Sequence, residues 1–131
     1  MEILKIKTKK CQIGDFGEDA AIKLLKRKKF KIIKRNYVAV NHEIDIIAEN
    51  HEMQIFVEVK TRIVEGDNDI RPADAVNKEK MRAIIKAASY YTGFNPSEKK
   101  KRFDVIEVYL EEKKGKLSVL RTNHIEGAFT R

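Results

Sequence analysis

The sequence has few of the residues that mark disulfide-rich, membrane-spanning or multi-domain chains. Its 131 residues include one cysteine, Cys11, two prolines, six glycines and no tryptophan. A single cysteine excludes an intramolecular disulfide and a multi-thiolate metal site. The apolar runs, such as residues 55–57, are far shorter than the ~18 residues of a membrane-spanning helix, and the charged first ten residues resemble no signal peptide. We therefore expect one soluble, cytoplasmic domain over residues 1–131 that has no membrane partner.

What the chain has in excess is positive charge, and this charge is unevenly distributed. The net charge is +8, with 12 basic and 4 acidic side chains in residues 1–40 and 13 basic and 7 acidic in residues 78–131. Between them, residues 41–77 carry 3 basic and 9 acidic side chains. A basic excess favours polyanionic partners. One interpretation is an electropositive rim around an acidic, cation-binding centre, and the alternative is that these charges decorate solvated faces.

Hydrophobic periodicity predicts two helices and five strands. Residues 1–13 are basic and lack a long period, and they are interpreted as a loosely held N-terminal arm or a short leading element. The predicted helices cover residues 15–29 and 73–91, and the predicted strands cover residues 30–40, 43–48, 54–61, 102–110 and 116–121. The order αβββαββ predicts an α/β protein with a central mixed sheet flanked by helices.

The strongest chemical signal lies on the second and third predicted strands. Side chains alternate along a strand, so Glu58 and Lys60 share one face, as do Glu43 and Asp45. With a hairpin turn at residues 50–51, Glu43 lies opposite Glu58, and Asp45 is the diagonal neighbour of Glu58. Two such carboxylates favour Mg²⁺ or Mn²⁺, and Lys60 beside them can orient an attacking water or stabilise negative charge. The alternative is a ribbon whose polar face is simply solvated.

Two charged residues interrupt the apolar stripes of the predicted helices. Glu18 lies at the edge of the first stripe and Lys80 lies inside the second. Each could face the sheet, or be an ordinary first-turn glutamate and a lysine that extends to solvent. The basic run at residues 99–102 is interpreted as solvated by default, and Tyr90 with Tyr91 as packing residues rather than a platform for stacked bases.

Several short motifs, in order, resemble the YraN-type family of bacterial proteins over residues 14–110. They are Gly14-x-x-Gly17-Glu18, Arg35-Asn36-Tyr37, Glu43-Ile44-Asp45-Ile46-Ile47-Ala48, Phe56-Val57-Glu58-Val59-Lys60-x-Arg62, Lys80 and Arg102-Phe103-Asp104. That family is similar to the restriction-endonuclease-like PD-(D/E)XK superfamily, and in layout to archaeal Holliday junction resolvases. His42 stands where the family usually has glycine.

The resemblance implies a restriction-endonuclease-like fold and Mg²⁺-dependent cleavage of phosphodiester bonds in nucleic acid, DNA above all and branched DNA as one substrate. It implies Asp45, Glu58 and the Val59 carbonyl as metal ligands, with Glu18 completing the acidic cluster. Lys60 would position the water, and Arg62 and Lys80 would give polar support. Two alternatives are a nucleic-acid-binding domain without catalysis and a scaffold protein. A homodimer with two sites is left open.

Overall fold

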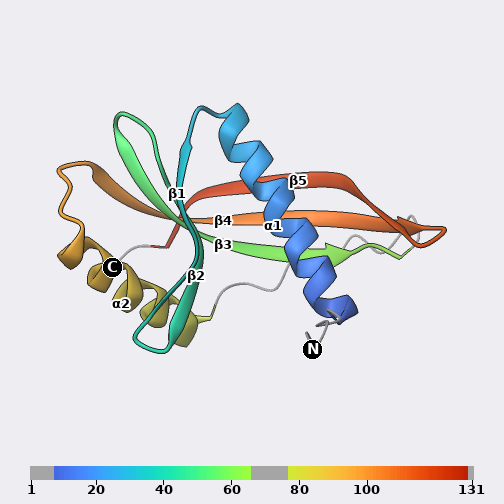
Figure 1. Cartoon of the computed structure of the whole chain (residues 1–131), viewed down its shortest axis with the longest axis horizontal. Helices are drawn as coiled ribbons and strands as arrows, with labels where there is room; N and C mark the ends of the chain where they lie inside the picture. The colour runs from blue at the N-terminus through green and yellow to red at the C-terminus, as the bar shows by residue number, and fades with distance from the viewer. Residues whose placement is uncertain (1–7, 66–76, 130–131) are drawn as a thin grey trace, which may run out of the picture.

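The computed structural model describes residues 8–65 and 77–129. These residues form two helices and five strands, which follow one another in the predicted order αβββαββ. No helix among these residues is long and apolar enough to cross a membrane. Figure 1 shows the elements along the chain. Their bounds are α1 Lys9–Arg27, β1 Lys31–Ala39, β2 His42–Glu49, β3 Met53–Ile63, α2 Lys78–Phe94, β4 Lys100–Lys113 and β5 Lys116–Phe129.

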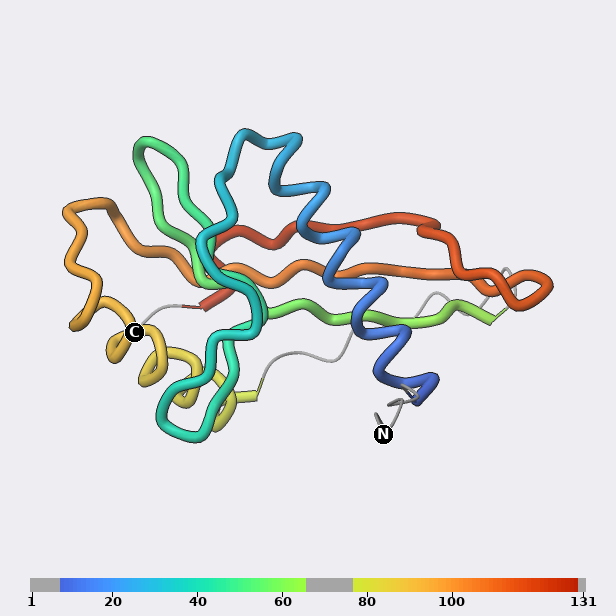
Figure 2. Tube along the Cα trace, in the orientation of Figure 1, coloured from blue at the N-terminus to red at the C-terminus, as the bar shows by residue number. Residues whose placement is uncertain are grey.

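The five strands form one mixed sheet in the order β1-β2-β3-β4-β5. Neighbouring strands are antiparallel except β3 and β4, which are parallel. A parallel pair needs a crossover connection, and α2 lies in the segment that joins β3 to β4. The trace in Figure 2 shows α1 crossing β3, β4 and β5, while α2 lies near β1 and β2. The mixed α/β sheet with helices is therefore confirmed.

Alternating side chains on the sheet divide the core into two clusters. The cluster with α2 contains Ile47, Phe56 and Phe103, while the cluster with α1 contains Ile46, Val57 and Ile106. Neighbouring residues of one strand thus belong to opposite clusters, as the period of a strand requires. Phe56 packs against Phe103 with ring centroids 5.5 Å apart. The predicted faces of the third strand are confirmed, and Glu58 follows Phe56 on the α2 side.

The first helix begins earlier than predicted. Its N-cap is Thr8, whose hydroxyl accepts a hydrogen bond from the Cys11 N–H, and the helix starts at Lys9 rather than near residue 15. The interpretation of residues 1–13 as an arm is therefore wrong for residues 9–13, and residues 1–7 lie outside the described residues. The first turn is exposed and has no apolar stripe, so periodicity could not find it.

The C-terminal half also differs from prediction at its ends. The second helix runs to Phe94 and begins at Lys78 after the N-cap Asn77, while residues 73–76, where it was expected to start, lie outside the described residues. The strands β4 and β5 are both longer than predicted, and β5 continues for eight residues beyond residue 121. Most of β5 is exposed and its pairing with β4 is interrupted twice, so its sequence has no clean alternation.

Helix α1 packs closely on β3 at Gly17. A Cβ atom at this buried position would lie 1.9 Å from the Thr61 Oγ1. We expect Gly17→Ala to lower the free energy of unfolding by about 1–3 kcal/mol because the helix must move away from the strand. Denaturant unfolding measures this change. Gly14→Ala is the matched control, since a Cβ there meets nothing within 4 Å, and it should stabilise the same helix by about 0.5–1 kcal/mol.

Candidate functional site

The hairpin of β2 and β3 brings the predicted carboxylates to the same side of the sheet. Ile47 pairs with Phe56 and Ile46 with Val57, which displaces the partner of each β2 residue by two positions from the predicted register. The predicted pairing of Glu43 opposite Glu58 is therefore wrong. The turn is longer than expected because the Asn50 side chain accepts the N–H groups of Glu52 and Met53. A displacement by an even number of residues keeps every side chain on its predicted face.

Asp45 stands where the pairing of β2 and β3 ends. Beyond Ile46 and Val57, the next contact between the strands uses a side chain, because the Val59 N–H donates to the Asp45 Oδ2 at 2.8 Å. Burial, followed by the negative charge of Glu58, raises the pKa of Asp45 from 3.8 to about 7, although the Val59 N–H opposes this rise. A partly buried acid that ionises near neutrality is typical of functional sites.

Glu58 is the most buried of the predicted site residues, at 5% exposure. Its Oε1 lies 2.5 Å from the Lys80 Nζ and 4.0 Å from the Lys60 Nζ. Burial lowers the pKa of Lys80, but the hydrogen bond and charge of Glu58 outweigh this effect and the pKa is raised overall. Lys80 therefore faces the sheet rather than solvent alone, which decides between its two interpretations. Both ammonium groups are positioned beside the carboxylate.

Glu18 from α1 and Glu43 from β2 extend the acidic cluster. Burial and then the charge of Glu43 raise the pKa of Glu18, and both carboxylates contribute to the raised pKa of Asp45. The Asn36 amide nitrogen, oriented towards these groups, donates to the Glu43 Oε1 at 2.6 Å and to the Glu18 Oε1 at 2.9 Å. Glu18 is thus a member of the cluster and not only a first-turn glutamate.

Asn36 is the residue of this site to which sequence reasoning gave no role. It lies in β1 with a positive φ of 52°, a conformation that asparagine tolerates better than most residues. Its neighbours fasten the strand to both helices, since Arg35 pairs with Asp19 at 3.0 Å and Tyr37 packs against Tyr91 with centroids 5.2 Å apart. The sequence did contain one signal for this residue, because asparagine is uncommon in the interior of a strand.

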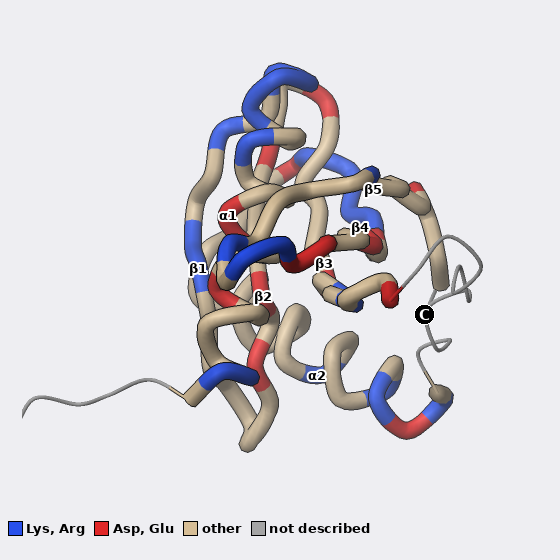
Figure 3. Tube along the Cα trace, turned by 90° about the vertical axis from the view of Figure 1, so that its right-hand side faces the viewer, with Lys and Arg blue, Asp and Glu red and all other residues tan. Residues whose placement is uncertain are grey.

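The resemblance alone assigned roles to Val59 and Arg62, and both belong to β3, the strand that carries Glu58 and Lys60. Val59 contributes its N–H to Asp45, and Arg62 is a partly buried residue of β3 two positions beyond Lys60. Figure 3 shows acidic positions on α1 and β2 and basic positions on β1 and α2.

The basic run at residues 99–102 is largely engaged inside the protein. Lys99 pairs with Glu49, and Arg102 donates two hydrogen bonds to the buried Asp104 at 2.8 and 2.9 Å. Lys101 donates to two main-chain oxygens in the preceding loop. The default interpretation of a solvated run is therefore wrong for these three residues, which hold β4 in place.

The donor set fits a hard divalent cation in the way that Mg²⁺ is usually held. No three His, Cys, Asp or Glu side chains within residues 8–65 and 77–129 converge closely enough to surround an ion by themselves. Mg²⁺, however, is commonly bound by one or two carboxylates and completes its shell with water and substrate phosphate. The negative charge of Glu58 is the second cause of the raised pKa of Asp45, after burial, so these two carboxylates act on each other's neighbourhood in the site.

Residues 17–108 match the uncharacterised protein family UPF0102. The chain is 44% identical over 120 residues to a UPF0102 protein of Clostridioides difficile, a match that covers 88% of this chain and 95% of the relative. It is 39% identical over 124 residues to one of Caldanaerobacter subterraneus, with 94% and 98% covered, and 36% identical over 118 residues to one of Flavobacterium psychrophilum, with 89% and 92% covered.

Proposed function

The chain belongs to the UPF0102 family, and we propose that it is a Mg²⁺- or Mn²⁺-dependent nuclease that hydrolyses phosphodiester bonds, DNA being the expected substrate. The proposal includes a restriction-endonuclease-like, PD-(D/E)XK arrangement of the sheet. The observation that carries it is the meeting of Asp45, Glu58 and Lys60 where β2 and β3 separate. Carboxylates can hold a divalent cation, and an adjacent ammonium can orient water or stabilise negative charge, which are elements of metal-dependent hydrolysis.

The residues of the site divide the work of hydrolysis between them. Asp45, Glu58 and the Val59 carbonyl would hold the cation, which would supply Lewis-acid stabilisation of the phosphate charge. Lys60, on the same face of β3 as Glu58, is placed to hold the attacking water by a hydrogen bond. Lys80 gives a second positive charge for the oxygens of the reacting phosphate. Glu18 and Glu43, joined by Asn36, keep the outer wall of the cluster negative.

A binding protein without catalysis remains the second candidate because one observation favours it. The Lys80 ammonium already balances the Glu58 charge in the described structure, as expected if no cation were needed. The grouping of Asp45, Glu58 and Lys60 favours the nuclease instead, because a protein that only binds nucleic acid has no need for two carboxylates beside an ammonium.

A cleavage assay tests the proposal directly. Purified protein is incubated with plasmid, single-stranded and four-way-junction DNA in Mg²⁺, in Mn²⁺ and in EDTA. We expect cleavage in either metal and none in EDTA. Lys60→Ala should reduce the rate about a hundredfold or more because the water loses its positioning group, while DNA binding in EDTA changes little. Lys114→Ala, in the turn after β4, is the matched control and should cut at the wild-type rate.

The outcomes separate the candidates. Wild-type protein that binds DNA with ordinary salt dependence but never cuts it would favour the binding protein. Protein that neither binds nor cuts would favour a scaffold role. Equal rates for wild type and Lys60→Ala would remove Lys60 from the mechanism.

A further inference from the structure

The exposed face of α2 carries a continuous row of cations and aromatic rings. Every fourth residue from the first position of the helix is exposed, and these residues form what we call the α2 ridge: Lys78, Arg82, Lys86, Tyr90 and Phe94. Residues four apart are neighbours on a helix surface, so the five side chains lie one after another. The cationic half of the ridge begins two residues before Lys80, whose ammonium contacts Glu58 in the site.

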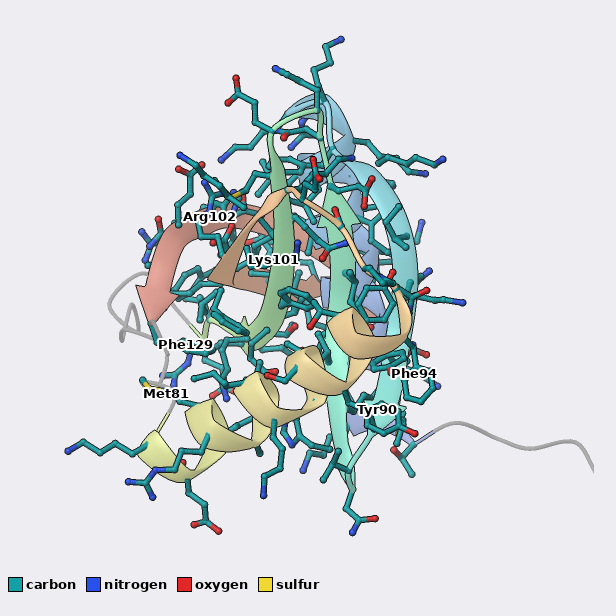
Figure 4. The ribbon with its side chains drawn as sticks, turned by 90° about the vertical axis from the view of Figure 1, so that its left-hand side faces the viewer. Met81, Tyr90, Phe94, Lys101, Arg102 and Phe129 are labelled. Atoms are coloured by element: carbon teal, nitrogen blue, oxygen red, sulfur yellow. The ribbon has the colours of Figure 1, made fainter. Side chains whose placement is uncertain are left out.

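The aromatic half of the ridge is unusually exposed. Tyr90 and Phe94 are 50% and 72% accessible, and their ring centroids lie 4.9 Å apart. Figure 4 shows both rings at the C-terminal end of α2. Their neighbour Tyr91 is buried against Phe56, so core packing accounts for Tyr91 and not for the exposed pair. Core and surface packing was expected of Tyr90 and Tyr91: core packing is confirmed for Tyr91, and Tyr90 packs on Phe94 at the surface, where both rings stay exposed.

Charge complementarity identifies what this surface suits. Glu79 is the single acidic residue of α2, against four cations, and Lys78, Arg82 and Lys86 form no ion pair with a described residue. Proteins that bind single strands combine cations along the phosphate backbone with aromatic rings on which bases stack. Paired bases are not free to stack on a protein ring, whereas unpaired bases are. The α2 ridge therefore matches a nucleic acid with an unpaired segment next to the site.

We propose that the α2 ridge binds a single-stranded segment of the substrate, with its phosphates on Lys78, Arg82 and Lys86 and an unpaired base on Tyr90 and Phe94. This inference rests on the proposed nuclease function and narrows its substrate class to single-stranded or branched nucleic acid. The ridge and Lys80 share the N-terminal end of α2, but residues two apart project from opposite sides of a helix, so a strand bound on the ridge reaches Glu58 only by passing around this end.

Binding in EDTA tests the ridge without cleavage. Fluorescence anisotropy is measured with a labelled single strand of about 12 nucleotides, a duplex with such an overhang, and a blunt duplex. We expect the wild type to prefer the first two. Tyr90→Ala/Phe94→Ala should weaken binding to them about tenfold or more and leave the blunt duplex unchanged. Phe94→Leu, which keeps an apolar side chain but removes the ring, should lose part of the same preference.

The cations have a separate signature. Arg82→Ala/Lys86→Ala should weaken binding to all three probes and reduce the slope of log affinity against log salt by about two. The controls are Lys114→Ala/Lys116→Ala and Val119→Ala/Leu120→Ala, which change exposed residues at or near the turn of the β4–β5 hairpin. That turn lies at the opposite end of the molecule from α2 in Figure 1. Neither control should alter the preference for unpaired strands.

The results distinguish failure of the ridge from failure of the proposed function. Unchanged single-strand binding by Tyr90→Ala/Phe94→Ala, with the wild type still cutting DNA in Mg²⁺, would overturn the ridge and leave the nuclease standing. Binding that depends on the ridge in a protein that never cuts would support the surface and remove the catalysis. Wild-type binding to vesicles of anionic lipid, but not to the oligonucleotides, would overturn the ridge as a nucleic-acid surface.

Discussion

Asp45→Asn is expected to abolish metal-dependent cleavage and, at the same time, to stabilise the metal-free protein at alkaline pH. The cleavage rate should fall about a hundredfold or more because an amide replaces a charged ligand. The carboxyl group has a pKa of about 7 in the folded protein, whereas its ordinary pKa is 3.8. Between these values the folded state retains a proton that the unfolded chain has lost, so the wild type becomes less stable as pH rises.

The raised pKa also sets how much more stable than the wild type Asp45→Asn should be, and how this difference depends on pH. Each pKa unit corresponds to about 1.4 kcal/mol, and we expect Asp45→Asn to exceed the wild type by about 1–3 kcal/mol at pH 8. The difference should shrink as the pH falls from 7 and disappear below 3.8, where the wild-type carboxyl group becomes protonated in the unfolded chain as well. Urea unfolding at several pH values in EDTA measures it. The amide oxygen can still accept the Val59 N–H, so the local structure is kept.

A second measurement ties the same residue to the cation. Mg²⁺ or Mn²⁺ should raise the melting temperature of the wild type at pH 8, because a ligand that binds only the folded state stabilises it. Asp45→Asn should lose this rise. Asp19→Asn is the matched control, since Asp19 is exposed and pairs with Arg35 on the surface, and it should keep both the metal response and the cleavage rate. A metal response that survives in Asp45→Asn would exclude Asp45 as a ligand.

Asp104→Ala is expected to give the largest loss of stability among single substitutions at charged residues. Asp104 is fully buried and accepts hydrogen bonds from the Arg102 guanidinium, the His124 ring nitrogen and the Gly127 N–H. The bonds from His124 and Gly127 join β4 to the C-terminal part of β5. The substitution leaves the partly buried Arg102 guanidinium without its buried partner, and loss of one member of a buried pair typically costs about 3–5 kcal/mol. Thermal and denaturant unfolding measure the loss.

The pH dependence of Asp104 has the opposite sign to that of Asp45. Burial alone would raise its pKa, but hydrogen bonds from His124, Arg102 and Gly127 outweigh burial and lower it below 3.8. Its stabilising effect is therefore complete above the unfolded pKa and is lost as pH falls through the lower, folded pKa. The wild type should thus lose more stability than Asp104→Ala on acidification below pH 4.

Glu126 provides the control for this second substitution. It also pairs with Arg102, at 3.7 Å, but its side chain is 53% exposed. Exposed ion pairs contribute little, so Glu126→Ala should change stability by less than about 1 kcal/mol. If Asp104→Ala and Glu126→Ala lost similar amounts of stability, burial would not be the reason that the Asp104 hydrogen bonds stabilise the protein.

The local sequence determined the elements whose apolar residues repeat regularly. The strands around Ile46 and Val57 were predicted from their short apolar runs, and their faces followed because successive side chains of a strand point to opposite sides. The first turn of α1 and the end of β5 were missed because exposed, polar segments have no such alternation. Tertiary contacts rather than pattern define them, such as the ion pair of Lys9 with Glu112 and the bond of Gly127 to Asp104.

The sequence alone also placed Asp45, Glu58 and Lys60 on one side of a hairpin, since alternation survives an error of two residues in the register. Only the tertiary structure decided which distant groups join them. Glu18 lies near the cluster because Gly17 allows α1 to pack closely on β3. Lys80 contacts Glu58 from α2, which follows the hairpin in the chain. The Asn36 amide bonds to both Glu18 and Glu43. Contacts between helix residues and strand residues depend on how the helices pack on the sheet, and the spacing of residues along the chain does not determine that packing.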